Sequence, residues 1–424
     1  MLDYADHRFH LDTLLRAALK AADPAEAVRR HWRESDLDGV DRVFIVGAGK
    51  AGVAMAEAAA DLLGPRLTRG VVAVPQLPIT NHQSPITFIP AGHPRPSEGS
   101  LRAGDAIAEF LSNTTEHDLV LALISGGGSA LLDRLVPGIT LDDLQSLTDG
   151  LLRSGAPINE VNCVRKHLSL IKGGGLARMA APARVLSLIL SDVIDDPLDV
   201  IASGPTVPDP TTVEDAKAIL RKYLDLTGFG NLSGLTFHET PKPGDPIFDR
   251  VTNRLVGSNA LARNAAADAA RSLGFIAHTP PVTVQGEARE WFEKTRREVL
   301  RKHFASDAPQ AFIFGGETTV TVRGNGMGGR NQELALAAAI ALDGVPEKIV
   351  VASVGTDGVD GPTPAAGAFA TPESVSRARA LGLDAVTMLA NNDSHSFFSA
   401  LGDCIITGPT GTNVNDLVIV LVYG

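Results

Sequence analysis

Five short segments rich in glycine, serine and aspartate each follow an apolar run of the sequence. They read GAGK, SGGGS, SDVIDD, GGET and GTDGVDG. In open α/β sheets, ligands bind at the carboxyl ends of the strands, so we expect these segments to form the walls of a ligand site. Backbone amides, hydroxyls, carboxylates and nearby cations are the groups that phosphoryl transfer needs. The pattern therefore favours an enzyme that handles phosphate.

The segment VGAGKAG has Gly47, Gly49 and Gly52 in the G-x-G-x-x-G spacing of dinucleotide sites, with Lys50 inside it. A nicotinamide site also needs an acidic residue about 20 residues further on. Residues 62–96 contain no Asp or Glu, which argues against that site. A turn that only packs a helix on a sheet would leave the lysine unexplained. We predict that the turn presents Lys50 to phosphate oxygens, with Gly47 and Gly49 at a nucleotide.

The segment ISGGGSALL favours an anion site, because consecutive glycines let backbone N–H groups turn toward one point and serines add hydroxyl donors. The candidate binding residues are Ser125, Gly126, Gly127, Gly128 and Ser129. No G-x-x-x-x-G-K-[ST] pattern occurs in the chain, so this is not a Walker A loop. Further along, NCVRKHLSLIKGGGLA holds a basic cluster in an acidic protein. Arg165 and Lys166 are therefore candidates for binding carboxylate or phosphate, and a solvated basic face is the alternative.

Carboxylates follow several apolar runs. Asp192 lies closest to the end of the run ARVLSLIL, and it is our candidate for a general base or a Mg²⁺ ligand. Its acidic neighbours are expected to stabilise turns or cap helices. In the second half, Glu317 and Asp357 are further candidate metal ligands.

A cation also opens a helix in the second half of the chain. Arg330 follows two glycines and begins the segment RNQELALA, which makes it a candidate phosphate clamp, with Asn331 beside it. The remaining candidates are residues of glycine-rich or polar loops that could contact a nucleotide, namely Gly315, Gly316, Thr410 and Asn413.

Strand-like and helix-like segments alternate along the chain, which predicts an α/β fold with layers around a largely parallel sheet. The strand candidates are DRVFIVGAG, RGVVAVP, HDLVLALISGG, ARVLSLILSD, QAFIFGG, TTVTVRG, KIVVASVGTDG and DLVIVLVYG. Helices are expected at 50–63, 100–112 and 330–342. With 424 residues the chain should form two domains. We place their junction in the Gly- and Pro-rich stretch 231–248, which gives domains 1–240 and 241–424 and leaves open whether the last strand packs back on the first domain.

The charge and cysteine content of the chain limit the classes of partner that we expect it to bind. The formal net charge of −11 disfavours nucleic acid and anionic membrane surfaces. Cys163 and Cys404 stand far apart, which indicates neither a disulfide framework nor a zinc site and suits a reducing cytoplasm. The N-terminus does not resemble a secretory signal, and no apolar run is long enough to span a membrane.

Eight ordered segments, from about residue 10 to the end, resemble the glycerate 2-kinases long named hydroxypyruvate reductases, whose C-terminal part is called the MOFRL domain. The segments are VGAGKAG, GHPRPSEGS, LISGGGSALL, NCVRKHLSLIKGGGLA, SDVIDDPLDVIASGPTVPDPTT, GGETTVTVRGNGMGGRNQE, GTDGVDGPTPAAGA and TGPTGTNVNDL. The resemblance implies a Rossmann-like first domain, a smaller α/β second domain, and an active site in the cleft between them. It also implies ATP-dependent phosphorylation of the 2-hydroxyl of D-glycerate with a divalent metal such as Mg²⁺.

On the matching positions, the resemblance suggests Lys50 and Arg330 near the transferred phosphoryl group and Asp192 as base or metal ligand. The expected partners are D-glycerate and ATP, and a homodimer is compatible with the sequence. Two alternatives stay open. One is an NAD(P)H-dependent hydroxypyruvate reductase, and the other is a sensor that binds a sugar acid without chemistry.

Overall fold

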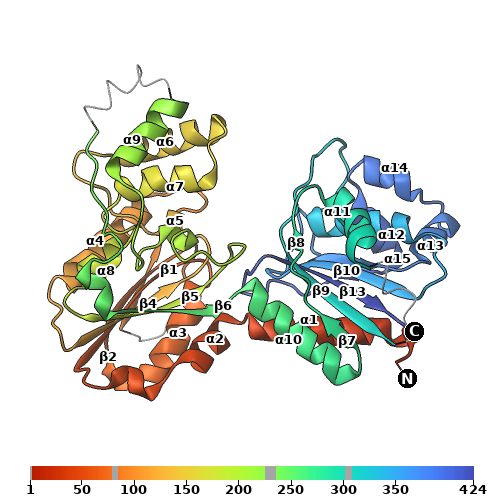
Figure 1. The fold of residues 1–424 in the computed structure, drawn as a ribbon, viewed down its shortest axis with the longest axis horizontal. Helices are drawn as coiled ribbons and strands as arrows, with labels where there is room; N and C mark the ends of the chain where they lie inside the picture. The colour runs from red at the N-terminus through yellow and green to blue at the C-terminus, as the bar shows by residue number, and fades with distance from the viewer. Residues whose placement is uncertain (1, 79–84, 225–234, 301–307) are drawn as a thin grey trace. The chain divides into compact units, whose positions relative to one another are not determined.

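The computed structural model describes residues 2–78, 85–224, 235–300 and 308–424, and these form two compact units. One unit spans Pro24–Val256, and the other combines Met1–Asp23 with Gly257–Gly424. The predicted domain junction was the stretch 231–248. Its first four residues lie outside the described residues, and the rest, 235–248, lies within the unit Pro24–Val256. Figure 1 shows the helices and strands of each unit.

The unit Pro24–Val256 is built on a six-stranded sheet with the order β3-β2-β1-β4-β5-β6. The strands are β1 Arg42–Ala48, β2 Leu67–Val74, β3 Ile86–Pro90, β4 Asp118–Ile124, β5 Arg184–Leu190 and β6 Val251–Gly257. The first five strands of this order pair in parallel. The order is that of the doubly wound dinucleotide-binding fold, as the resemblance implied for the first domain.

Helices cover both faces of this sheet, with α3 on one face and α4 and α8 on the other (Figure 1). The helices are α2 Pro24–His31, α3 Gly52–Leu63, α4 Glu98–Leu111, α5 Gly128–Leu131, α6 Leu141–Arg153, α7 Ile158–His167, α8 Gly175–Ala180 and α9 Val213–Tyr223. Short 3₁₀ helices cover Glu34–Leu37, Gly64–Arg66, Ile201–Ser203 and Pro246–Arg250. Buried strand residues on successive positions face opposite helical layers, which explains why β1 and β4 are apolar almost throughout.

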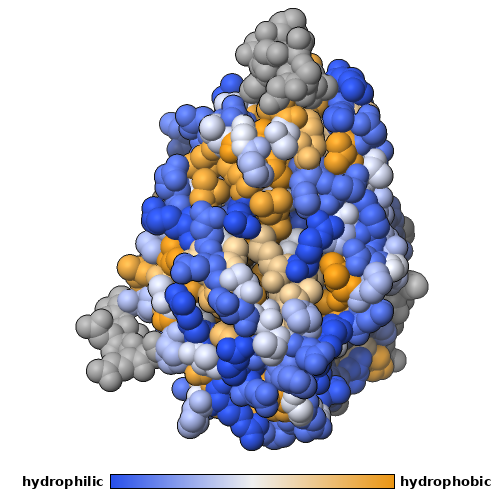
Figure 2. All heavy atoms as spheres, turned by 90° about the vertical axis from the view of Figure 1, so that its left-hand side faces the viewer, coloured by the Kyte–Doolittle hydropathy of each residue, from blue (hydrophilic) through white to orange (hydrophobic). Residues whose placement is uncertain are grey.

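Helices α6, α7 and α9 form a small layer with its own apolar core. Figure 2 shows apolar side chains gathered toward the end of this unit at which these helices lie. Leu152 of α6 and Ile158 of α7 are more than half exposed, at 53 % and 58 %. The helical layer therefore leaves apolar surface uncovered.

The second unit contains a seven-stranded sheet with the order β12-β11-β10-β13-β9-β7, and β8 also pairs with β9. The strands are β7 Ile276–His278, β8 Thr283–Val284, β9 Gln310–Gly316, β10 Ile349–Gly355, β11 Gly367–Ala370, β12 Cys404–Ile405 and β13 Asp416–Val422. Four of the pairings are antiparallel, and only β7 and β8 run parallel to β9. The expectation of a largely parallel sheet is therefore wrong for this unit.

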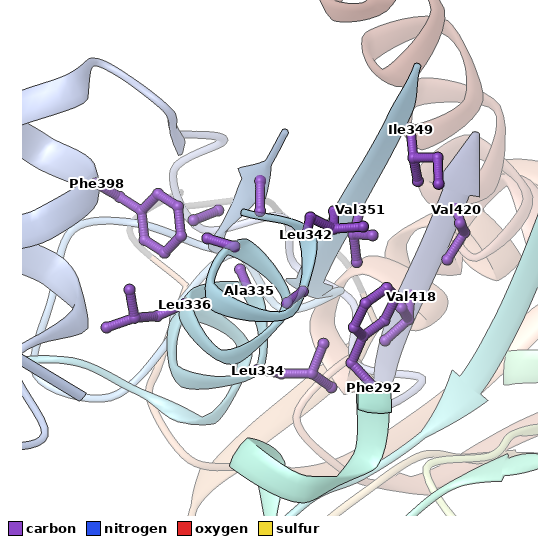
Figure 3. Packing of buried hydrophobic residues seen from close by; sticks show 14 of the residues in the cluster. Phe292, Leu334, Ala335, Leu336, Leu342, Ile349, Val351, Phe398, Val418 and Val420 are labelled. Carbon is purple, nitrogen blue, oxygen red and sulfur yellow. The ribbon is translucent and has the colours of Figure 1, made fainter. Parts of the chain in front are cut away.

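Helices α1 and α10 lie together on one face of this second sheet, and α11, α12 and α15 lie on the other (Figure 1). The helices are α1 His7–Ala21, α10 Asn259–Leu273, α11 Ala288–Thr295, α12 Arg330–Leu342, α13 Ser374–Ala380, α14 Ala385–Ala390 and α15 Ser394–Leu401, with a 3₁₀ turn at Tyr4–Asp6 and a π-helical turn at Arg296–Leu300. In Figure 3, Leu334 and Leu342 of α12 pack toward Val351 and Val418 of the central strands. This packing fixes the helix whose first residue is Arg330.

Three observations about the predicted elements matter for the site. The segment TTVTVRG, 318–324, is an irregular loop rather than a strand, with a single β-bridge at Thr319. The last strand, β13, lies in the centre of the second sheet between β9 and β10. The N-terminal helix α1 belongs to the same unit as β13. None of the described helices is long and apolar enough to cross a membrane.

Candidate functional site

The loops after β1 and β4 lie side by side, because these two strands are paired neighbours. The Lys50 N–H donates to the Gly126 carbonyl at 2.9 Å, and the Ser125 N–H donates to the Ala48 carbonyl at 3.0 Å. The Ala51 N–H donates to the Ser125 Oγ at 3.1 Å. Strand order reverses between β1 and β4, and ligands of doubly wound folds bind at this switch point.

The GAGK loop uses its backbone donors within the protein. Besides the Lys50 and Ala51 amides, the Gly49 N–H donates to a carbonyl of β2 at 3.2 Å, and the Gly52 N–H donates to the Gly49 carbonyl at 3.1 Å. A Cβ on Gly49 would lie 1.9 Å from the Ser125 Oγ, and one on Gly47 would lie 2.7 Å from a carbonyl of β4. These glycines permit close packing between loops, and a nucleotide role for Gly47 and Gly49 stays a prediction.

The SGGGS loop differs, because the amide N–H groups of Gly126, Gly127 and Ser129 have no hydrogen-bond partner among the described residues. Gly127 has φ +81°, which is left-handed backbone that glycine adopts without strain. Three unpaired amides within four residues around a left-handed turn are the arrangement of a backbone anion site. We call these three amides the glycine nest.

Lys50 and Arg165 supply positive charge at the glycine nest. Lys50 is exposed, and a Cβ on Gly127 would lie 3.5 Å from its Cγ. The Arg165 Nη2 donates to the Ser129 carbonyl at 2.7 Å, while its buried Nε has no partner. Burial lowers the pKa of Arg165, with Asp133 acting in the opposite direction. Arg165 forms no ion pair within the described part of the chain.

Asp133 does not neutralise Arg165, because it is already paired with a second buried cation. The Lys172 Nζ lies 2.9 Å from the Asp133 Oδ2 and donates to the Leu132 carbonyl at 2.8 Å. Burial lowers the pKa of Lys172 to about 8, with Asp133 opposing that shift. The buried Lys172 and the partly buried Arg165 therefore lie near one carboxylate beneath the SGGGS loop, and Lys172 takes the ion pair with it.

Asp192 also reaches the nest, since a Cβ on Gly126 would lie 2.1 Å from its Oδ2. Gly128 packs against Ala202 on the opposite side of the loop, and Ser203 Oγ lies 2.7 Å from Ser129 Oγ. Ala202 and Ser203 have φ of +51° and +61°. Left-handed backbone at residues other than glycine costs on the order of 1 kcal/mol each and tends to occur at functional sites.

Lys166 points to a different cluster. Its Nζ lies 3.4 Å from the Asp209 Oδ1 and 3.7 Å from the Asp199 Oδ2, and the side chain is almost fully buried. Asp209 also accepts hydrogen bonds from Thr211 and Thr240. The structure therefore brings Arg165 to the nest and uses Lys166 in a buried ion pair.

In the second unit, Arg330 is held by two carboxylates. Its Nε and Nη2 donate to the two oxygens of Asp416 at 2.6 and 2.9 Å, and its Nη1 lies 2.8 Å from the Glu317 Oε1. Burial acts to lower the pKa of Arg330, but the bonds to Asp416 outweigh it and raise that pKa above its ordinary value. Burial raises the pKa of Asp416 to about 6, against the lowering effect of Arg330.

The first turn of α12 is capped by a buried carboxylate. The Asp360 oxygens accept from the Asn331 N–H at 3.0 Å and the Gln332 N–H at 2.9 Å. Asn331 is 1 % exposed, and its Oδ1 accepts from the Ser353 Oγ at 2.7 Å. This helix terminus is therefore occupied by the protein's own anion, and the polar groups of Asn331 are used internally.

A pocket of about 770 Å³ opens in front of Arg330. Its walls include Glu317, Val322, Asp357 and Val359. We call it the valine pocket. Within the described residues, no three His, Cys, Asp or Glu side chains converge closely enough to hold a metal ion.

The residues predicted to contact a nucleotide are used in packing. A Cβ on Gly315 would lie 1.6 Å from the Asn259 Oδ1, and one on Gly316 would lie 2.3 Å from the Val284 carbonyl. The Thr410 Oγ1 donates to the Thr356 carbonyl at 2.6 Å, and the Asn413 Oδ1 accepts from the Asn415 N–H at 3.1 Å. Their nucleotide role stays a prediction.

Sequence reasoning missed three residues at these sites. His93 packs on the nest, because a Cβ on Gly127 would lie 2.8 Å from its ring. Burial and the nearby Lys50 lower the pKa of His93. Ser203 and Asp416 were also missed, although each lies within a motif of the resemblance, which was the available signal.

Comparison with known proteins gives consistent matches over both units. A family model described as a domain of unknown function, DUF4147, matches residues 10–227, and the MOFRL family matches residues 310–416. The D-glycerate 2-kinase of Thermotoga maritima is 42 % identical over 412 residues, which cover 96 % of this chain and 97 % of that protein. The glycerate 2-kinase of Pyrococcus horikoshii is 40 % identical and covers 96 % of both chains.

A crystal structure of the glycerate kinase from Thermotoga maritima matches with a TM-score of 0.89 and 40 % identity, covering 99 % of this chain and 100 % of that chain. These findings confirm the resemblance that the eight motifs indicated. The chain belongs to the glycerate kinase family, with the DUF4147 and MOFRL domains in this order.

Proposed function

We propose that the protein transfers the γ-phosphoryl group of ATP to the 2-hydroxyl of D-glycerate, giving 2-phosphoglycerate and ADP. Two relatives of at least 40 % identity carry the name glycerate 2-kinase. The observation that carries the assignment is the glycine nest beside the unneutralised charge of Arg165. A small acid with one carboxylate provides the countercharge that this site lacks.

The nest binds the carboxylate of D-glycerate through the amides of Gly126, Gly127 and Ser129, and Arg165 adds charge beneath it. This fixes the acid end and leaves the 2-hydroxyl next to Asp192, whose carboxylate accepts the hydroxyl proton. Lys50 at the rim neutralises charge on the transferred group. Such catalysis consists mainly of positioning and charge stabilisation.

The unit that contains Arg330 binds ATP. Arg330 is held in a fixed orientation by Asp416 and contacts the phosphate chain. Mg²⁺ usually binds through one or two carboxylates together with phosphate oxygens and water, so Glu317 would hold it beside the nucleotide in exchange for a bond to Arg330 or Asn415. When bound, the metal neutralises β- and γ-phosphate charge. A cytoplasmic location and a homodimer belong to the same proposal.

The reductase alternative has less support. A dinucleotide needs free amides in the first βα turn and an acidic residue after the second strand. The amides of Gly49, Lys50 and Ala51 are all used internally, and the segment after β2 contains no acidic residue up to Pro96. The GAGK loop thus lacks both groups that would bind NAD(P)H.

A coupled assay tests the proposed reaction. The protein is incubated with ATP, Mg²⁺ and D-glycerate, and enolase alone is then added. We expect phosphoenolpyruvate, since enolase acts on 2-phosphoglycerate and not on the 3-isomer. Oxidation of NAD(P)H on addition of hydroxypyruvate, without ATP-dependent product, would support the reductase instead.

A further inference from the structure

The loop 317–329 forms one wall of the valine pocket, and side-chain hydrogen bonds hold its backbone although it is neither helix nor strand. The Asn392 Oδ1 accepts from the amides of Arg323 and Gly324 at 2.7 and 3.0 Å. The Asp393 Oδ1 accepts from the Met327 N–H at 3.2 Å. These two side chains accept hydrogen bonds from the backbone amides of the loop. The loop therefore has a defined conformation at the pocket before any ligand binds.

Two valines from different loops are exposed in this pocket. Val322 of the loop 317–329 is 75 % exposed, and Val359 of the loop after β10 is 47 % exposed. Single exposed valines are common on protein surfaces. Two of them line one pocket of about 770 Å³, which has the size of a small-molecule site, and they give its otherwise polar wall an apolar part.

The charged residues that line the pocket indicate which class of ligand fits it. Glu317 and Asp357 are acidic, and the positive charge of Arg330 is already balanced by Asp416. An anionic group therefore gains no net attraction from these charges, and an uncharged ring with hydroxyl donors suits this part of the pocket better.

Asp357 is placed to accept such hydroxyls. Its Oδ1 accepts from the Val359 N–H at 3.1 Å, and its Oδ2 has no hydrogen bond within the described residues. A carboxylate that is fixed by one oxygen and open at the other suits a pair of vicinal hydroxyls, as in nucleotide sites that hold a ribose.

We propose that the valine pocket binds the nucleoside part of ATP, with the base between Val322 and Val359 and the ribose hydroxyls on Asp357. This inference rests on the proposed kinase function and assigns Asp357 to the ribose instead of the metal. The phosphates then extend from the ribose toward Arg330, which lines the same pocket.

Paired surface variants test the base subsite. Val322→Asp places a charge against the base, and Val386→Asp is the matched control, since Val386 is 63 % exposed on α14 and does not line the pocket. We expect the KM for ATP to rise about tenfold or more in V322D, with the KM for D-glycerate unchanged and V386D like the parent. Equal KM values for ATP in the two variants would overturn the proposal.

Ribose analogues test Asp357. In the parent protein, we expect 2′-deoxy-ATP or 3′-deoxy-ATP to have a KM about tenfold above that of ATP, and we expect Asp357→Asn to remove most of this difference while leaving the Mg²⁺ dependence unchanged. A D357N variant that keeps the preference for ATP but needs much more Mg²⁺ would return Asp357 to the metal and overturn the ribose assignment.

Equilibrium titration of AMP in the presence of EDTA separates this proposal from the kinase assignment, since it needs neither metal nor turnover. We expect V322D to weaken AMP binding about tenfold relative to V386D. If AMP binds both variants equally while phosphoenolpyruvate still forms in the coupled assay, the pocket assignment fails and the kinase stands. If V322D weakens AMP binding but no phosphoenolpyruvate forms, the pocket stands and the kinase assignment fails.

Discussion

Two glycine-rich segments of this protein each precede a helix and lie beside an arginine. They differ in whether the protein's own carboxylates already pair with the amides and the arginine. At the glycine nest, three amides are unpaired and Arg165 lacks an ion pair within the described residues. At the start of α12, Asp360 accepts from the first amides, and Arg330 is held between Asp416 and Glu317. The amides of the first segment are uncapped among the described residues, whereas those of the second are already capped by the protein's own carboxylate.

This difference explains why the two regions suit different ligands. A buried cation without a countercharge is costly and is relieved by a bound anion, so the nest suits the compact carboxylate of a small acid. A cation that is held by carboxylates is pre-oriented but nearly neutral, so the region around Arg330 suits a ligand whose phosphate charge is shared with a metal ion. The number of nearby carboxylates, and not the arginine itself, therefore decides which ligand each region suits.

The largest expected effect comes from removing the unneutralised charge. Arg165→Met should lower kcat/KM for D-glycerate by about 100- to 1,000-fold, or roughly 3–4 kcal/mol, because the acid loses its countercharge. The stability of the folded protein should not fall, since a costly buried charge disappears. Steady-state kinetics and denaturant unfolding measure the two effects. Arg178→Met, on the exposed side of α8, serves as the control and should keep full activity.

Loss of activity in R165M together with a large loss of stability would mean that Arg165 is a structural residue. Retention of near-normal kcat/KM would show that the nest does not need this charge. Either result would remove the contrast with Arg330.

A smaller effect should follow from uncapping α12. Asp360→Ala leaves buried amides without an acceptor, and we expect the free energy of unfolding to fall by about 2–3 kcal/mol. Asp384→Ala removes the exposed cap of α14, where water can replace the carboxylate, and should cost about 1 kcal/mol or less. Chemical denaturation compares the two. Equal losses would show that the carboxylate at α12 is not the buried anchor described above.

The smallest effect concerns the pH dependence of Asp416. Burial raises its pKa to about 6, above the ordinary value near 3.9 in an unfolded chain. The folded state therefore holds this proton more tightly, and the resulting stability is complete below about pH 4 and is lost as the pH rises through 6. Between pH 4.5 and 7.5 the parent should lose about 2 kcal/mol relative to Asp416→Asn. Parallel unfolding profiles of the two proteins would contradict a raised pKa.

Local patterns predicted the elements well where neighbours in sequence decide the outcome. The strand QAFIFGG and the helix 330–342 appear with the predicted bounds. The segment TTVTVRG alternates like a strand, yet the amides of its last two residues bind Asn392 and that of Met327 binds Asp393, about 70 residues away. The charge state of Arg330 depends in the same way on Asp416, 86 residues further along the chain. Contacts of this kind leave no trace in local periodicity.

The site was predictable to a similar degree. Residue type and position predicted that Lys50, the SGGGS loop and Asp192 lie close together, because the loops after paired parallel strands meet at one edge of the sheet, and their roles in catalysis stay predictions. Which glycines expose their amides was not predictable. Whether an amide is exposed depends on whether a neighbouring carbonyl or carboxylate lies within hydrogen-bonding distance. The amides of GAGK have such acceptors, and three amides of SGGGS have none among the described residues.

A crystal structure of the complex with D-glycerate tests the central claim most directly. We predict that the carboxylate lies about 3 Å from the amide nitrogens of Gly126, Gly127 or Ser129, next to Arg165, with the 2-hydroxyl toward Asp192. A carboxylate bound to Arg330, or a nest without ligand in a protein that has bound D-glycerate elsewhere, would contradict the account.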